Sequence, residues 1–400
     1  MRLYNTLSRR VEEAEFPSGV VKMYVCGITP YETSHLGHAR VGVVYDTLRR
    51  YLEHQGLRVR YVQNVTDIDE PLFERARRDG VRWQDLGEQQ TERYLRALQR
   101  LNIEKPEFYV RATSVIPEMI SVITRLIEQG HAYVRNGSVY YHAASHENFG
   151  AIAHADYQTM LAMANEMGNN PDDPNKLDPL DFVLWQPSKE DEPAWESPWG
   201  PGRPGWHIEC STMATEYLGS QIDIHGGGTD LIFPHHACEI AQAEPVTGVT
   251  PFVRYWMHTG MVSLSGTKMS KSLGNMVFVD EVLTSYSPPA LRLAILSYPY
   301  GAEFEYADQA VARAEEIVTT LREALAATGA DRGYVLDGEQ DRARFLAALA
   351  DNFDTPTAIV VLSDLAAAVI TAAQAQQDVR PAQRVLHDMA NVLGAQLWPV

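Results

Sequence analysis

Four residues with metal-binding side chains stand out because their types and positions would suit a zinc ion. Cys26 ends the first predicted strand, and Cys210 closes the run Trp206-His207-Ile208-Glu209-Cys210. His235 and Glu239 are four residues apart, so on a helix their side chains share one face. Two thiolates, an imidazole and a carboxylate form a tetrahedral zinc set. The spacing alone leaves open that each cysteine is a small buried hydrophobic residue.

Two neighbours of this set have a less direct interpretation. Cys238 and His236 would point away from the face that carries His235 and Glu239 if the segment is helical, so we assign them a supporting role. A zinc-dependent hydrolase with Glu209 or Glu239 as its base would need an open, water-bearing metal position. That alternative does not explain the lysine-rich loop described next.

Two further motifs have the chemistry of phosphate binding. In His35-Leu36-Gly37-His38, Gly37 would let a phosphate reach the start of a helix, where free N–H groups favour anions. Lys268-Met269-Ser270-Lys271-Ser272 places two lysines in a Gly/Ser-rich loop that can neutralise charge developing on departing pyrophosphate. Taken singly, the first motif is equally compatible with a surface turn and the second with a solvated basic loop.

The elements around these motifs predict a parallel sheet. Residues 20–25 alternate as a strand, residues 40–55 have helical periodicity, and residues 57–62 form a second strand. Strand, helix and strand in this order are the unit of a parallel sheet with a crossover helix. Ligands of such sheets bind at the carboxyl ends of the strands, where Cys26 lies.

The remaining chain alternates between helical patterns and loops. Helices are predicted at 88–101 and 116–128, and Asn136-Gly137 indicates a hairpin turn. Residues 165–205 are rich in Pro, Asp and Asn and are predicted as long loops, and a strand follows at 221–224. The C-terminal hundred residues predict a helix bundle, with helices at 307–325, 342–351, 356–376 and 382–393.

Composition limits the possible classes of protein. The chain has 400 residues, 45% of them hydrophobic, which suggests two or three domains with sizeable cores. The sequence has no run of about 18 consecutive apolar residues, so it predicts no membrane span. Three cysteines do not make a disulfide framework, so we expect a reduced, cytoplasmic location.

The net charge of −18 argues against broad, non-specific adhesion to nucleic acid. A local basic strip could still meet phosphates, although a solvated helix and strand face is the simpler interpretation. Its members are Arg40, Arg49, Arg50, Arg58 and Arg60.

Together, the His-x-Gly-His and Lys-Met-Ser-Lys-Ser motifs resemble the double signature of class I aminoacyl-tRNA synthetases. Over nearly its whole length the chain resembles cysteinyl-tRNA synthetases, and equally their relative, the mycothiol-pathway cysteine ligase. The runs that carry this resemblance are Met23-Tyr24-Val25-Cys26-Gly27, Tyr61-Val62-Gln63-Asn64-Val65-Thr66-Asp67, Asp178-Pro179-Leu180-Asp181-Phe182-Val183-Leu184-Trp185, Gly202-Arg203-Pro204-Gly205-Trp206-His207-Ile208-Glu209-Cys210, Asp223-Ile224-His225-Gly226-Gly227-Gly228 and Asp230-Leu231-Ile232-Phe233-Pro234-His235-His236.

The resemblance implies a role for each site residue. The zinc ligands would be Cys26, Cys210, His235 and Glu239. The cysteine pocket would comprise Cys26, Thr66, Trp206 and Asp230. ATP would contact Gly27, His35, Gly37, His38, Gly226, Gly228, Lys268 and Lys271, and the catalytic residues would be His35, His38, Lys268 and Lys271. Magnesium is expected with ATP. Zinc would favour a thiolate over the hydroxyl of serine by bond chemistry, so no editing domain would be needed.

The resemblance also implies an α/β fold with a Rossmann-like catalytic domain, an inserted connective segment and a C-terminal helical bundle. We expect the first Rossmann half at 1–106, the insertion at 107–204 and the second half at 205–280. A connecting helical unit would follow at 281–320 and the bundle at 321–400, with no anticodon-binding module after it.

The acceptor of the activated cysteine separates the two relatives. Leu3-Tyr4-Asn5-Thr6-Leu7 and Glu239-Ile240-Ala241-Gln242 resemble cysteinyl-tRNA synthetases, which transfer the acyl group to tRNA. Gly27-Ile28-Thr29-Pro30-Tyr31, His258-Thr259-Gly260-Met261 and, loosely, residues 166–171 resemble the ligase that acylates the amine of glucosaminyl-inositol. The chain also stops where an anticodon module would begin.

We therefore expect ATP, L-cysteine and the acceptor stem of tRNA as partners, and no membrane. Glucosaminyl-inositol is the alternative acceptor. A non-catalytic nucleotide- or tRNA-binding paralogue is a more remote alternative, because its motifs would be degenerate and these are complete.

Overall fold

The computed structural model describes residues 1–269, 273–330 and 333–397. Its centre is a five-stranded sheet with strand order β11-β10-β3-β4-β5, and all neighbouring strands are parallel. The strands are β3 (Val20–Ile28), β4 (Arg58–Val65), β5 (Phe108–Arg111), β10 (Ile222–Gly228) and β11 (Val253–Thr259). The strand order reverses between β3 and β10, which is where open α/β sheets bind ligands. The predicted α/β class is confirmed.

The crossover helix α1 (Leu36–His54) connects β3 to β4 and starts four residues earlier than the predicted start at residue 40. His35 explains the difference, because it is extended and its side chain accepts a hydrogen bond from the backbone N–H of His38. Gly56 then adopts a φ of 82°, which ends the helix and starts the turn into β4. The His-Leu-Gly-His motif is therefore the cap and first turn of α1.

Several elements are absent from the sequence-based prediction. The first is α2 (Glu70–Asp79), which is followed by α3 (Trp83–Arg100), a longer version of the helix predicted at 88–101. Asp69 caps α2, and Gly80 ends it in the left-handed conformation. Strand β5 was also missed, and it pairs with β4. The central sheet thus extends to Arg111, beyond the boundary expected at residue 107.

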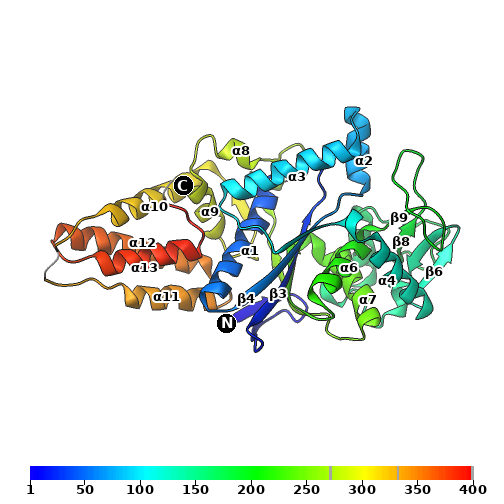
Figure 1. Cartoon of the computed structure of the whole chain (residues 1–400), viewed down its shortest axis with the longest axis horizontal. Coiled ribbons are helices and arrows are strands. Elements are labelled where there is room, and N and C mark those ends of the chain that lie inside the picture. The colour runs from blue at the N-terminus through cyan, green and yellow to red at the C-terminus, as the bar shows by residue number, and fades with distance from the viewer. Residues whose placement is uncertain (270–272, 331–332, 398–400) are drawn as a thin grey trace.

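Between β5 and α6 (Trp206–Leu218) the chain forms a separate layer (Figure 1). It contains α4 (Ile116–Glu128), α5 (Tyr157–Glu166) and a four-stranded antiparallel sheet in the order β6-β7-β8-β9. The strands are β6 (Ala132–Arg135), β7 (Ser138–Tyr141), β8 (Phe182–Gln186) and β9 (Arg203–Pro204). The predicted hairpin at Asn136-Gly137 is confirmed, and both turn residues have positive φ.

The prediction that residues 165–205 form only loops is wrong. Strand β8 lies in this region and pairs with β7, and its Leu184 and Trp185 are fully buried. An apolar run this short is difficult to recognise as a strand without its partner. Arg203 connects the layer to α2 through an ion pair of 2.8 Å with Glu70. It also pairs at 2.9 Å with Glu192, which lies between β8 and β9 of the layer itself.

The C-terminal part begins with a small sheet and two short helices. The sheet has the order β13-β12-β14, from β12 (Val262–Leu264), β13 (Thr267–Lys268) and β14 (Phe304–Tyr306). The helices are α8 (Val279–Val282) and α9 (Pro288–Leu296). The predicted bundle is confirmed and comprises α10 (Asp308–Ala326), α11 (Glu339–Ala350), α12 (Thr355–Gln374) and α13 (Arg380–Val392).

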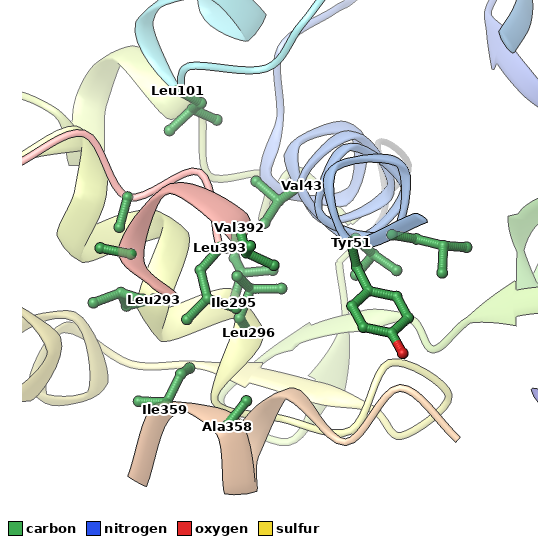
Figure 2. Packing of buried hydrophobic residues seen from close by; sticks show 14 of the residues in the cluster. Val43, Tyr51, Leu101, Leu293, Ile295, Leu296, Ala358, Ile359, Val392 and Leu393 are labelled. Carbon is green, nitrogen blue, oxygen red and sulfur yellow. The ribbon is translucent and has the colours of Figure 1, made fainter. Parts of the chain in front are cut away.

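The bundle shares one hydrophobic core with the catalytic sheet. Figure 2 shows Val43 of α1, Leu293 of α9 and Val392 of α13 converging on one cluster. Among the described residues, one helix, α12, is long and apolar enough to cross a membrane, and half of its apolar window is buried. Ile359 of α12 lies in this same cluster, so its apolar face is the core of the bundle.

Candidate active site and metal centre

The four predicted zinc ligands converge at the carboxyl end of the central sheet. Cys26 comes from β3, Cys210 from α6, His235 from the turn before α7 (Ala237–Thr247), and Glu239 from α7 itself. All four are buried, and one ligand atom from each lies within 4.8 Å of the others. Glu239 Oε1 is 3.2 Å from His235 Nε2 and 3.8 Å from Cys26 Sγ. Their types and proximity match a tetrahedral zinc site.

The turn before α7 brings an additional histidine to this cluster. Phe233 is extended, with φ −141° and ψ 135°, so the chain from Ile232 to His236 does not continue the helix. His236 itself has helical φ and ψ and lies three residues before Glu239, so it shares the helix face of Glu239 and points inward, with Nε2 3.3 Å from Cys26 Sγ. The expectation that His236 points away from the ligands is therefore wrong. Cys238 does lie apart and lines a different cavity.

Behind the ligands lies a chain of buried histidines that the sequence analysis did not connect. His236 Nδ1 is 2.7 Å from His258 Nε2, and His258 Nδ1 is 2.7 Å from Thr6 Oγ1. On the other side, His207 Nδ1 is 2.9 Å from His235 Nδ1. These contacts fix the orientation of each imidazole, as is usual for groups around a metal.

His225 completes the histidine cluster from β10. Its Nε2 is 3.4 Å from Glu239 Oε1 and 3.8 Å from Cys26 Sγ. Together with His236 it gives a second group of four potential ligands that shares Cys26 and Glu239 with the first. The signal that could have found His225 and His258 is their position near the ends of adjacent parallel strands, β10 and β11.

Burial controls the charges of these groups when no metal is bound. Desolvation lowers the pKa of His225 and of His258 to about 3, so both imidazoles are neutral at pH 7. Desolvation likewise raises the pKa of the Cys26 thiol and of the Glu239 carboxyl well above their ordinary values. A cation between them would favour the thiolate and carboxylate forms instead.

One polar atom of the cluster supports occupation by a cation. Glu239 Oε2 is buried and has no hydrogen-bond partner among the described residues. Buried polar atoms without a partner are rare and destabilising, and a bound ion is one way in which proteins satisfy them. The donor set of sulfur, imidazole nitrogen and carboxylate oxygen fits zinc.

Next to the metal cluster lies a cavity of 360 Å³ that brings together most of the residues expected to bind the nucleotide. The first turn of α1 opens onto it, and the rings of His35 and His38 stack with centroids 3.6 Å apart. The predicted residues that line it are Cys26, Gly27, His35, Gly37, His38, Gly228 and Asp230. Cys26 thus belongs both to the metal cluster and to the wall of this cavity.

Two of the predicted site residues lie behind the cavity wall. Gly226 packs against α1, since a Cβ there would be 1.9 Å from the hydroxyl oxygen of Tyr45. Its lack of a side chain therefore serves helix–sheet packing. Thr66 is 2% exposed at the end of β4 and accepts a hydrogen bond of 3.1 Å from Asn64 Nδ2.

The remaining predicted residues are Trp206 and the two lysines. Trp206 stacks on the imidazole of His235, with ring centroids 4.3 Å apart. Lys268 lies in β13 opposite Ser263, where only its backbone is described. Lys271 lies outside the described residues.

Trp206 also lines a larger cavity, of 850 Å³, between the catalytic sheet and the inserted layer. Trp206, His207 and Cys238 line it on one side, and Tyr140 and Phe182 of the inserted sheet line it on the other. Its charged lining residues are Asp69, Glu70, Glu166 and Asp173, against Lys176 and Arg203. Any second substrate in this cavity would meet a mainly acidic wall.

A family model for the class I (C) tRNA synthetase catalytic domain matches residues 13–316. The chain belongs to the cysteinyl-tRNA synthetase family. The chain is 43% identical over 401 residues to a cysteine–tRNA ligase of Dehalococcoides mccartyi, and the alignment covers 99% of this chain and 86% of that relative.

A second kind of relative has the same identity over a shorter stretch of the chain. The chain is 43% identical over 376 residues to the L-cysteine:1D-myo-inositol 2-amino-2-deoxy-alpha-D-glucopyranoside ligase of Tsukamurella paurometabola, covering 93% of this chain and 89% of that relative. Among solved structures, methionyl-tRNA synthetase of Mycobacterium tuberculosis in complex with methionyl-adenylate matches with a TM-score of 0.67 at 15% identity, covering 94% of this chain and 89% of that one. That likeness shows the shared class I synthetase fold.

Proposed function

We propose that this cysteinyl-tRNA synthetase family member is a cysteine–tRNA ligase that activates L-cysteine with ATP and transfers it to tRNA. The observation that carries the proposal is the position of Cys26. Its thiol belongs to the metal cluster, while the same residue lines the 360 Å³ cavity beside α1. A cysteine held by its sulfur at the cluster would thus be next to a bound nucleotide. Such proximity of the reacting groups is what adenylate formation needs.

On the nucleotide side, the first turn of α1 would bind the phosphates. Its free N–H groups and helix dipole favour anions, and Gly37 leaves room for close approach. His35 and His38 would donate hydrogen bonds to the phosphates, and Lys268 and Lys271 would neutralise the departing pyrophosphate. Magnesium would accompany ATP.

On the amino-acid side, Cys26, Cys210, His235 and Glu239 would hold zinc. Zinc would supply a soft Lewis acid that binds the thiolate of the substrate in preference to the hydroxyl of serine. Trp206, already fixed on His235, would close one side of the cysteine pocket, and Asp230, which lines the 360 Å³ cavity, would contact polar groups of the substrate. The three cysteines are free and buried, which supports a reducing, cytoplasmic location.

The test is charging of total tRNA with labelled cysteine, ATP and zinc. Acid-precipitable, base-labile cysteinyl-tRNA is the expected product. Changes in the acceptor stem are expected to reduce charging more than changes in the anticodon. Charging that depends on the anticodon and ignores the acceptor stem would contradict this mode of recognition.

A second candidate acceptor, the amine of glucosaminyl-inositol, is favoured by the charge of the 850 Å³ cavity. Four carboxylates and two basic side chains line it, and Arg203 already forms ion pairs with Glu70 and Glu192. Such a wall attracts an ammonium group and accepts hydrogen bonds from hydroxyls, whereas it repels phosphates.

One assay separates the two acceptors. Cysteine-dependent ATP–pyrophosphate exchange without tRNA charging, together with formation of an amide with the amino sugar, would select the second candidate. If the amino sugar is the acceptor, Asp173→Asn should raise the KM for the amine and leave the KM for cysteine unchanged. Asp173 lines the 850 Å³ cavity but belongs neither to the 360 Å³ cavity nor to the metal cluster.

A further inference from the structure

Arg40 of α1 is a buried cation that forms no ion pair with the acidic residues in the described part of the chain. It is 1% exposed, and its Nη2 donates hydrogen bonds of 3.2 Å to the carbonyl oxygens of Pro299 and Tyr300 and a third to that of Ala302. Its Nε and Nη1 atoms have no hydrogen-bond partner among the described residues. The interpretation of Arg40 as part of a solvated basic strip is therefore wrong.

Two of the carbonyl groups that Arg40 binds, those of Tyr300 and Ala302, also lie close to Gly260. The backbone N–H of Gly260 donates a 2.8 Å hydrogen bond to the same Tyr300 oxygen. A Cβ at Gly260 would lie 2.0 Å from the Ala302 oxygen, so only glycine allows this close approach. The loop from Pro299 to Ala302 is thus held between Arg40 on one side and Gly260 on the other.

Gly260 forms part of the wall of the 360 Å³ cavity, together with Thr259 and Met261. The first turn of α1, with His35 and His38, forms another part of the cavity wall. One helix therefore supplies one part of the wall directly and supports the Gly260 part through Arg40. We propose that Arg40 is a positioning residue that fixes the Gly260 wall of the nucleotide cavity relative to the start of α1.

The chemistry of the side chain supports this role. Burial lowers the pKa of Arg40 to about 10, which leaves the guanidinium charged at neutral pH. The charge of Glu303 and the ring of Phe304, whose centroid is 5.4 Å from the guanidinium carbon, offset only part of the cost of burying this charge, so its burial does not by itself benefit folding. The rigid, planar guanidinium holds Nη2 at one position among the three carbonyl oxygens, whereas a lysine ammonium sits on a flexible stem.

The experiment compares nucleotide binding by Arg40→Met, Arg40→Lys and a control, Arg49→Met. Arg49 lies on the same helix and donates a 2.9 Å hydrogen bond to a backbone carbonyl, that of Lys105, which is not part of the loop from Pro299 to Ala302. Affinity for a non-hydrolysable ATP analogue with magnesium, and separately for cysteine, is measured by calorimetry on the zinc-loaded protein.

We expect Arg40→Met to weaken nucleotide binding at least tenfold, Arg40→Lys to weaken it less, and Arg49→Met to leave it unchanged. Cysteine affinity should stay within twofold in all three variants. Wild-type nucleotide affinity in Arg40→Met would overturn the proposal, as would equal losses of nucleotide and cysteine binding. If Arg40→Met does not fold, Arg40→Lys decides by the same criterion.

This inference relies on the proposed function only for the identity of the nucleotide. A wild-type protein that binds the ATP analogue but shows neither tRNA charging nor cysteine-dependent exchange would refute the proposed function, and the comparison of variants would still test Arg40. A wild-type protein that does not bind the analogue would refute both.

Discussion

Asp46 of α1 and Arg292 of α9 form an ion pair in which each side chain is only 1% exposed. The guanidinium of Arg292 also donates to the carbonyl oxygens of Leu393, at 2.6 Å, and Leu101, at 2.9 Å. One side chain thus connects the catalytic helix, the connecting unit and the end of the bundle. These parts have to fold together for the pair to be buried.

Arg292→Met is expected to lower the free energy of unfolding by at most about 3–5 kcal/mol, because it removes one of the two arginines paired with the buried Asp46 carboxylate, the other being Arg50 at 2.8 Å. Urea denaturation measures the change. Arg344→Met is the control, since Arg344 is 54% exposed and its ion pair with Asp341 is expected to contribute less than about 1 kcal/mol. Similar effects of the two substitutions would contradict a special role for the buried pair.

Cys210→Ser is expected to reduce zinc affinity strongly and to weaken discrimination between cysteine and serine, because it removes one of two thiolates from the cluster. Zinc content after dialysis and the exchange rates with the two amino acids are the measurements. Cys238→Ser is the matched control, since Cys238 is equally buried in α7 but lies outside the ligand group. Unchanged zinc content in Cys210→Ser would remove Cys210 from the set.

His258 predicts a pH dependence of stability in the metal-free protein. Burial, and then the proximity of His225, lowers its pKa to about 3, whereas an unfolded histidine has a pKa near 6.5. Below pH 6.5 the unfolded state therefore binds a proton that the folded state does not. The stabilisation is complete above pH 6.5 and is lost as the pH falls toward 3.

A variant without the imidazole isolates this effect. Between pH 6 and 4.5, the stability of the wild type relative to His258→Asn should fall by about 1.4 kcal/mol per pH unit. Denaturation of both proteins in the presence of a chelator at several pH values measures the difference in their free energies of unfolding. The contributions of the other titrating groups largely cancel in this difference. A difference that does not change with pH would mean that His258 titrates normally in the folded protein.

Lys271→Ala is expected to slow adenylate formation while cysteine binding stays nearly intact, because the lost charge would act mainly on departing pyrophosphate. Cysteine-dependent ATP–pyrophosphate exchange and calorimetric titration with cysteine measure the two effects. A normal exchange rate would show that this lysine does not act on pyrophosphate.

The helices and strands that could be predicted from the sequence are those in which apolar residues recur at regular spacing. The strand–helix–strand unit around α1 and the four bundle helices have clear apolar periodicity, which depends only on neighbouring residues. Helix α2 was missed because only Leu72, Phe73 and Ala76 are buried among its ten residues. Strand β5 has four residues, too few for a pattern, and only its pairing with β4 defines it.

The sequence by itself determined which residue types were present for metal and phosphate chemistry. It predicted the four residues that converge as the metal cluster, because side-chain chemistry and spacing can be read from the chain. Only the tertiary structure decided that His225 and His236 join them, that His258 contacts His236, and that Arg40 is buried. The reason is physical: the parallel sheet places β3 beside β10, although the two strands are about two hundred residues apart in sequence.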